Sequence, residues 1–286
     1  VLFRSELLER IMKEQDSFPA AQKQVAAYVV DNYYQIPFLS ITALARNIGV
    51  SDTTIIKFCN QLGFSGFGDF KKVFSDYVHS ELTMYNKISR SSLSPHSEHS
   101  PFSEVLEEDT ANIQSTLTNP INLDNMDHLI QMIQSAKGIY ALGGRSSSAL
   151  AEHLASTLRY LGLQVHTMTG GVGDYLDQIS TISTENLVIA FCFPRYTKLI
   201  VDSLRDLHEK GIPIVLITDT GLSPAYPYAD LVFHCSVTSS AYFPCYASCM
   251  SLINAICRGA GAALNPNASL HVRDLEKQLL ERGIFL

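Results

Sequence analysis

The second half of the chain alternates short apolar runs of strand length with longer stretches of helical periodicity. The runs lie at residues 138–142, 163–168, 187–193, 212–217 and 231–235. The helical stretches between them lie at residues 147–161, 174–182 and 197–210, followed by a short segment at 224–228. Consecutive strands joined by helices pair in parallel. The pattern therefore predicts an α/β fold with a doubly wound, five-stranded parallel sheet.

Two other zones precede the alternating one. Residues 1–78 show helical rather than alternating periodicity, and Pro19 suits the first turn of a second helix. This zone is expected to be an all-helical domain. Residues 80–103 contain eight serines, which is typical of a linker, and a helix is expected from Pro101 to Leu117.

These zones divide the chain into an N-terminal domain, a linker with a connecting helix, and a C-terminal domain. The expected boundaries are 1–78, 79–117 and 118–286. A last amphipathic stretch, residues 270–280, is expected to dock on the core or on a second subunit.

The bulk composition fits a globular protein of two domains. The 286 residues are 46% hydrophobic and 17% charged, and the longest apolar runs are too short to cross a bilayer. Because the first residues lack the apolar stretch of an export signal, the chain is expected to be cytoplasmic. The six cysteines are expected to be packed, reduced thiols, with metal binding or oxidation of Cys245 and Cys249 as the alternative.

The net charge of −7 is distributed unevenly. Residues 1–80 carry 8 basic and 8 acidic side chains, so the remainder of the chain holds the whole acidic excess. Between residues 46 and 72 the balance turns positive, with four basic and two acidic side chains. DNA contact needs a local basic face rather than a basic protein, so the total charge does not exclude a nucleic-acid binder.

Residues 41–60 carry the spacing of a helix-turn-helix. Ala45 lets two helices approach closely, and Gly49, four positions later, tolerates the positive φ of the turn. Ile55 and Phe58 then fall on the inner face of the second helix, and Ser51 is suited to cap its N-terminus. The alternative is a three-helix protein-interaction module with a solvated polar face.

The outer face of this second helix presents short polar side chains at its N-terminal end, where a recognition helix meets base edges. Lys57 suits a guanine or a phosphate, and Asn60 or Gln61 suits an adenine edge. The residues predicted to contact DNA are Ser51, Thr53, Thr54, Lys57, Asn60, Gln61, Lys71 and Lys72.

The residues around this helix resemble the N-terminal domain of the RpiR family of regulators. The resemblance rests on Thr54-Ile55-Ile56-Lys57-Phe58, on Leu62-Gly63-Phe64-Ser65-Gly66-Phe67 and on Phe70-Lys71. It covers nearly the whole chain and implies a helix-turn-helix joined to a sugar-isomerase (SIS) domain. The family usually carries arginine where this chain has Lys57, and lysine keeps the charge but loses the bidentate fork.

Two strand ends in the second domain present an arginine together with a hydroxyl. They are Gly143-Gly144-Arg145-Ser146-Ser147 and Phe193-Pro194-Arg195-Tyr196-Thr197. Ligands of open parallel sheets bind at the carboxyl ends of strands, and arginine suits phosphate or carboxylate. If the two strands are neighbours, one anion pocket receives both arginines; the alternative is a pair of tight turns with serine caps. The residues predicted to bind the ligand are Gly143, Arg145, Ser146, Ser147, Arg195, Thr197 and Ser239, while Tyr242 and Phe243 line the pocket or pack at a subunit contact.

Both loops depart from the SIS pattern that the resemblance implies. The second phosphate motif of that pattern reads Ser-x-Ser-Gly-x-Thr, and the aligned residues here are Cys192, Pro194, Arg195 and Thr197. Arg145 likewise stands at the third position of the usual Gly-x-Gly turn. The family implies a phosphosugar ligand, and the two arginines make a sugar acid a second candidate.

Three functions compete: a ligand-responsive regulator, a phosphosugar isomerase with an accessory helical domain, and a protein-interaction adaptor. We predict the regulator and no catalytic residue. Glu152 and His153 follow the first loop, but nothing pairs His153 with a second catalytic group, and His166, inside a strand, is expected to be packed. No metal-ligand spacing and no cofactor motif is evident. The expected partners are double-stranded operator DNA and a small anionic effector, with a homodimer or homotetramer as the assembly and no membrane.

Overall fold

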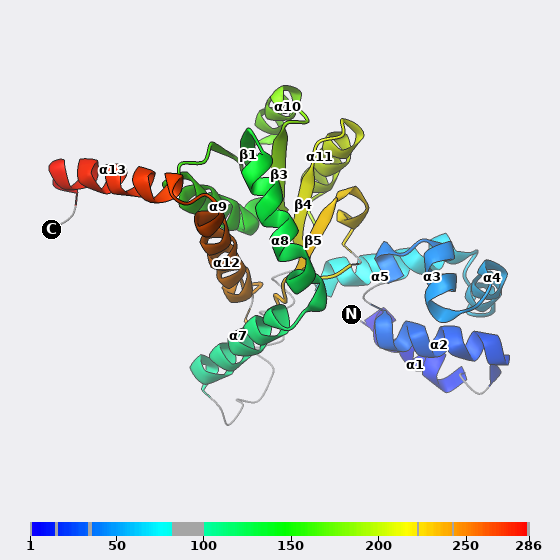
Figure 1. The fold of residues 1–286 in the computed structure, drawn as a ribbon. Helices are drawn as coiled ribbons and strands as arrows, with labels where there is room; N and C mark the ends of the chain where they lie inside the picture. The colour runs from blue at the N-terminus through cyan, green and yellow to red at the C-terminus, as the bar shows by residue number, and fades with distance from the viewer. Residues whose placement is uncertain are drawn as a thin grey trace. The chain divides into compact units, whose positions relative to one another are not determined.

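The computed structural model describes residues 2–14, 17–33, 36–81, 100–221, 223–241 and 243–284 (Figure 1). The chain divides into two compact units, residues 1–95 and 96–286. Most of the expected linker, residues 82–99, lies outside the described residues, and so does Tyr242.

The first unit is helical in its described residues, as expected. Its elements are α1 (Leu2–Glu14), α2 (Ala20–Asn32), the 3-10 turn η2 (Ile36–Phe38), α3 (Ile41–Ile48), α4 (Asp52–Gln61) and α5 (Phe67–Glu81). Phe58 of α4 is fully buried at the centre of an aromatic cluster. Its ring centroid lies 5.2 Å from that of Phe18 and 5.9 Å from that of Phe70. This cluster holds α4 against the segment before α2 and against α5.

The second unit is built on a five-stranded sheet with the order β2-β1-β3-β4-β5, and every neighbouring pair is parallel. The strands are β1 (Gly138–Gly143), β2 (Val165–Met168), β3 (Asn186–Phe191), β4 (Ile214–Thr218) and β5 (Leu231–His234). The predicted doubly wound parallel sheet is therefore confirmed. Because the chain winds from β1 to β2 on one side and to β3 on the other, the winding direction reverses between β1 and β3.

Helices cover both faces of this sheet (Figure 1). One face packs against α8 (Pro120–Ser135), α9 (Ser148–Tyr160) and α12 (Ala247–Ala263), and the other against α10 (Val172–Thr181) and α11 (Lys198–Glu209). The helices α8 and α12 were not predicted from the sequence. For α8 a local signal was present, since the Asn119 side chain caps the helix and proline occupies its first position.

The helix α7 (Pro101–Leu117) has the bounds that the sequence analysis expected, and it packs against α12. The amide of Asn112 donates to the Thr238 carbonyl at 2.7 Å, and its oxygen accepts from the Ser236 hydroxyl at 2.6 Å. Although the sequence analysis placed this helix in the connecting segment, α7 is thus an integral part of the second unit.

The C-terminal helix α13 (Asn267–Glu281) leaves the body of the second unit as an arm (Figure 1). Ala268, in its first turn, is its buried residue, and its remaining apolar side chains are half-buried or exposed. The expected docking along the core is therefore limited to the start of the helix, which contacts α9.

Among the described residues no single helix is long and apolar enough to cross a membrane; α12 and α13 reach that length only as a pair bent by 108°.

All six cysteines are free. Burial raises the pKa of Cys59 and of Cys192 to about 12, so both are protonated at neutral pH.

Asn122 ties the start of α8 to β5 and allows a first test of this fold. Its buried amide donates to the carbonyls of Thr116 at 2.9 Å and His234 at 2.7 Å, and its oxygen accepts from the His234 N–H at 2.7 Å. We expect Asn122→Ala to lower the free energy of unfolding by about 2–4 kcal/mol, because three backbone groups lose their partner. Urea denaturation measures the change. The exposed Asp127→Ala serves as control, and equal effects of both substitutions would contradict the assignment.

Candidate functional site

The turn between α3 and α4 has the geometry of a helix-turn-helix. Gly49 ends α3 with a φ of 82°, and its N–H donates to the Ala45 carbonyl at 2.9 Å. The Ser51 hydroxyl caps α4 by accepting from the Thr54 N–H at 3.2 Å. Across the turn, the Thr42 hydroxyl donates to a carboxylate oxygen of Asp52 at 3.0 Å. These contacts fix the two helices with respect to each other.

The side chains of α4 divide into a buried and an exposed face, as the spacing predicts. Ile55 and Phe58 are fully buried. Thr53 and Lys57 are exposed, and Thr54 is half-buried with its hydroxyl 2.9 Å from that of the cap, Ser51. Four other predicted DNA contacts are also exposed: Ser51, Asn60, Gln61 and Lys72.

Lys71 differs from the other predicted DNA contacts. Its ammonium group donates to the Leu39 carbonyl at 3.0 Å, and partial burial lowers its pKa. Lys71 therefore holds α5 against the segment before α3 and does not belong to the exposed set. Ile56, which the sequence analysis did not select, is exposed on α4. An apolar side chain at such a position suits the methyl group of a thymine.

In the second unit, the two predicted ligand loops lie side by side because β1 and β3 are neighbouring strands. Gly143 at the end of β1 pairs with Phe191 at the end of β3. A Cβ placed on Gly144 would lie 3.0 Å from Ile200 and 3.8 Å from the Thr197 hydroxyl, so the first loop touches the start of α11. This is the edge of the sheet where the winding direction reverses, and open α/β sheets bind ligands there.

Arg145 and Arg195 are the two non-glycine residues with positive φ among the described residues, at 56° and 70°. A left-handed backbone costs such a residue roughly 1–2 kcal/mol. Both side chains are exposed. The described ion pairs involve other arginines, namely Arg10, Arg205 and Arg273. Each loop therefore keeps the backbone of a glycine while carrying a guanidinium group that no described carboxylate neutralises.

The first loop is held by one contact from α10 and by one contact within its own turn. The Tyr175 hydroxyl donates to the Gly143 carbonyl at 2.9 Å, and the Ser148 hydroxyl donates to the Arg145 carbonyl at 2.6 Å. A Cβ on Gly143 would meet the Ser147 carbonyl oxygen at 2.5 Å, so this position requires glycine. Ser147 itself is buried. Of the predicted ligand residues, Gly143 and Ser147 thus shape the loop, while Arg145 and Ser146 are exposed.

The second loop is anchored on the end of β4. The Tyr196 hydroxyl donates to Asp219 at 2.8 Å, and the Thr218 hydroxyl donates to the Cys192 carbonyl at 2.6 Å. Burial raises the pKa of Asp219. Thr197 begins α11 without a side-chain capping bond and is half-buried. The Thr197 hydroxyl and the first N–H groups of α11 are therefore available as hydrogen-bond donors at this edge of the sheet.

Tyr246, which the sequence analysis did not select, contacts both loops. Its hydroxyl shares a hydrogen bond with that of Ser146 at 3.0 Å, and its ring centroid lies 5.5 Å from that of Phe193. No local pattern brings residue 246 to residue 146, because the contact depends on where α12 begins. The remaining predicted residue, Ser239, accepts from the Ala241 N–H at 3.1 Å, and no described contact brings it to either arginine.

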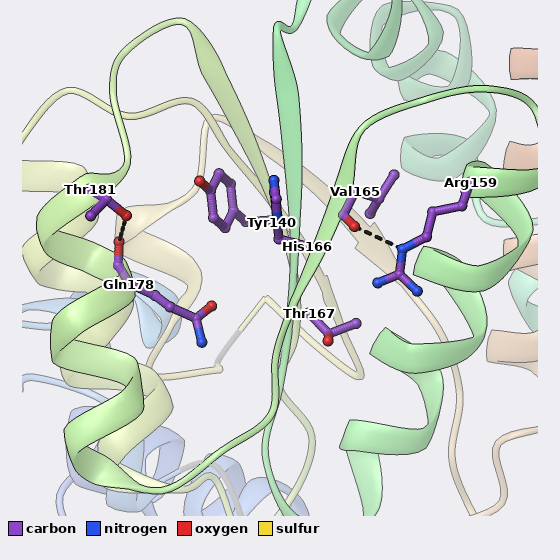
Figure 2. A pocket seen from close by; sticks show the side chains of 7 residues that line it. All are labelled: Tyr140, Arg159, Val165, His166, Thr167, Gln178 and Thr181. Atoms are coloured by element: carbon purple, nitrogen blue, oxygen red, sulfur yellow. Dashed lines mark hydrogen bonds between the residues drawn. The ribbon is translucent and has the colours of Figure 1, made fainter.

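A cavity of about 460 Å³ lies elsewhere, along the edge strand β2 (Figure 2). Its lining residues are Tyr140, Arg159, Val165, His166, Thr167, Gln178 and Thr181. His166 stacks on Tyr140 at 5.0 Å on one side of the strand, and on the other side Arg159 donates to the Val165 carbonyl at 2.8 Å. None of the predicted ligand residues lines this cavity. Its contacts are those of a covered sheet edge, in which an arginine satisfies an outward-facing carbonyl.

The acid and base candidates for catalysis remain dispersed in the second unit. Glu152 accepts from the Thr169 hydroxyl at 3.0 Å, whereas His166 is stacked at the cavity on β2. Among the described residues, no group of three or more histidine, cysteine, aspartate or glutamate side chains is arranged to hold a metal ion.

Comparison with known families now places the chain. Residues 5–81 match the helix-turn-helix domain of the rpiR family, and residues 132–259 match the SIS domain. This combination defines a DNA-binding regulator with a sugar-isomerase-type domain. The chain belongs to the RpiR family of transcriptional regulators.

Similar proteins agree with this assignment. HTH-type transcriptional regulators from Haemophilus influenzae and Clostridium perfringens are 22% and 24% identical to this chain. The matches cover 79% and 78% of this chain and 78% and 79% of the relatives. Vibrio vulnificus NanR has the same fold, with a TM-score of 0.68, 18% identity and coverage of 96% of this chain and 98% of NanR. The sugar isomerase domain of an RpiR transcription factor from Sphaerobacter thermophilus matches with a TM-score of 0.57 and 22% identity, over 60% of this chain and 96% of that domain.

The positive φ of the two loop arginines generates a prediction about stability. We expect Arg145→Gly and Arg195→Gly each to raise the free energy of unfolding by about 0.5–1 kcal/mol, since relief of the left-handed strain exceeds the entropy that glycine adds to the unfolded chain. Thermal and urea denaturation without ligand measure this change. Arg205→Gly, inside α11, should instead lower stability by about 1 kcal/mol. A loss of stability at both loop positions would show that the arginine side chains stabilise the free protein.

Proposed function

We propose that this regulator binds operator DNA with the exposed face of α4. We further propose that a small anionic metabolite, a phosphosugar or a sugar acid, binds at the edge of the sheet at β1 and β3 and controls the affinity for DNA. The observation that carries the proposal is the pair Arg145 and Arg195, both exposed, both at positive φ and both on neighbouring strand ends.

The DNA side of the proposal is supported by the exposed face of α4. Thr53 and Lys57 are available to enter a groove, while Asn60 and Gln61 offer amides for base edges. The capping interaction of Ser51 leaves the N-terminal end of the helix at the surface. Two such helices, brought by two subunits to a spacing of one DNA turn, suit a palindromic operator.

The effector side is supported by charge and by location. Two exposed guanidinium groups at neighbouring strand ends attract an anion, and residues held in strained conformations concentrate at ligand sites. NanR, the similar structure described above, is complexed with ManNAc-6P. A phosphosugar therefore fits the fold, whereas the arginines at two motif glycines add affinity for a carboxylate or a second anionic oxygen.

We further propose that the second unit senses its ligand without converting it. The Haemophilus influenzae and Clostridium perfringens relatives are named as transcriptional regulators. Glu152 accepts a hydrogen bond from Thr169, and His166 lies on β2, so neither of these two catalytic candidates is paired with an acid or base at the loops by a described contact. An effector that prefers one arrangement of the subunits needs a differential affinity of only about 1–3 kcal/mol to regulate DNA binding.

Lys57→Ala tests the DNA interface. We expect a weaker affinity for a duplex that the wild-type protein selects from a random pool, and a salt dependence whose slope falls by about one phosphate contact if Lys57 binds the backbone. Fluorescence anisotropy across a salt series measures both. The control is Lys277→Ala on α13. If the Lys57 variant binds DNA with unchanged affinity, Lys57 is not part of the DNA interface.

A ligand screen tests the effector site. Thermal shift is measured with glucose 6-phosphate, N-acetylmannosamine 6-phosphate, 6-phosphogluconate and gluconate, because a ligand of the folded state raises the melting temperature. For the compound that shifts the wild-type protein, we expect Arg145→Gly and Arg195→Gly to weaken binding about 10–100-fold, the loss of a charge-assisted bond. The control, Arg205→Ala, should bind as the wild type does. Full binding by both loop variants would move the site away from this edge.

A further inference from the structure

The helix α7 carries a stripe of exposed apolar side chains that the functions described so far do not use. Phe102 is 74% exposed, Leu106 49%, Ile113 38% and Leu117 60%. With 3.6 residues per turn, these four positions fall within an arc of about 60° on the helix surface. We call them the α7 stripe. The neighbouring face of the helix, which includes Asn112 and Thr116, is buried in the second unit.

The α7 stripe is symmetric about its own midpoint. Phe102 and Leu117 lie seven and eight residues from Asp109, and Leu106 and Ile113 lie three and four residues from it. An antiparallel copy of the helix, related by a two-fold axis near this midpoint, would set Phe102 opposite Leu117 and Leu106 opposite Ile113. A two-fold interface requires this property, since each contact must occur twice with the partners exchanged.

The distribution of charge selects the same arrangement. The acidic side chains of α7, Glu104, Glu107, Glu108 and Asp109, all lie in its N-terminal half, and residues 110–117 carry no charge. An antiparallel partner places each acidic half against an uncharged half. A parallel partner would bring the two acidic halves together, where like charges repel.

The exposed area is of the size that an interface core needs. Four side chains of these sizes and exposures present on the order of 400 Å² of apolar surface, which is the size of the largest apolar patch on a typical monomer, a patch that is often functional. Ile121 and Leu123, exposed at the start of α8, continue the apolar surface beyond the end of α7. With a polar rim, the total approaches the roughly 800 Å² per partner of a standard interface.

We propose that the α7 stripe is a dimer contact and that its occupant is the α7 stripe of a second copy of this chain, packed antiparallel across a two-fold axis. This contact would hold two subunits together, which is what the proposed binding of two α4 helices to a palindromic operator requires. It does not depend on which effector the protein binds.

Site-directed cross-linking tests the register of this contact in the full chain. We expect the double variant Leu106→Cys/Ile113→Cys to form a covalent dimer with oxidised glutathione, because each new thiol faces its counterpart on the partner. Within one helix the two thiols lie about 10 Å apart, too far to bond to each other. The matched control, Glu107→Cys/Gln114→Cys, has the same spacing but is rotated by about 100°. The wild-type protein gives the background from its own six cysteines. Equal cross-linking in variant and control, or none in either, overturns the proposed pairing.

Sedimentation velocity tests the energy of the contact. We expect the wild-type protein to be at least dimeric at micromolar concentration and Leu106→Glu/Ile113→Glu to weaken self-association at least 100-fold. Leu280→Glu on α13, also at an exposed leucine, should leave it unchanged. Circular dichroism and the thermal shift with an effector show whether the variant is folded and binds ligand. A folded variant that still dimerises, or a wild-type monomer, refutes the α7 contact. A dimer that cross-links as expected but shows no effector shift instead refutes the effector site and leaves the α7 contact standing.

Discussion

The parallel pairing of β1 with β3 is the constraint on which the second unit depends. Because β2 and β3 lie on opposite sides of β1, two loops that are about 50 residues apart in the sequence leave the sheet at adjacent points. The pairing is fixed by apolar residues that are buried on both faces of the sheet, among them Ile139, Leu142 and Ile189. A site assembled this way is as rigid as the sheet, so the loops can hold backbone conformations that an isolated turn would not keep.

The combination of a glycine conformation with an arginine side chain separates this chain from the SIS pattern. Hydroxyl-lined loops bind a phosphate through neutral donors, whereas a guanidinium group adds charge and a planar fork. Arg145 and Arg195 have a positive φ, the conformation that favours glycine, so each loop combines a glycine-type backbone with a positively charged side chain. The price of this change is strain in the free protein, offset by the anchors that Tyr175 and Tyr196 supply from either side.

Much of the fold could be predicted from the sequence because its signals are local. The period of the apolar runs defined the strands, and Ser51, Gly49 and Phe58 defined the helix-turn-helix by spacing alone. The residues of the candidate site were harder to predict from the sequence. Tyr246 reaches Ser146 only through the tertiary course of α12, and Lys71 was predicted on α5 as a DNA contact although its ammonium group turns to the Leu39 carbonyl. The α12 helix is rich in small residues and buries six of its 17 residues, a serine and a cysteine among them, so its sequence does not separate clearly into a polar and an apolar face.

Tyr246 gives the second unit a short physical connection between the proposed effector site and the proposed dimer contact. It touches both arginine-bearing loops and stands directly before α12, and α12 packs along the buried face of α7. The open face of the same α7 carries the stripe of Phe102, Leu106, Ile113 and Leu117. In the proposed mechanism, an anion that drew the two loops together would act on the Ser146–Tyr246 bond and hence on the start of α12. Since packed helices shift as rigid bodies, a small displacement there would reorient α7 and change the angle between the two subunits of the proposed dimer. The spacing of the DNA-binding domains would then follow from ligand occupancy without any contact between effector and DNA.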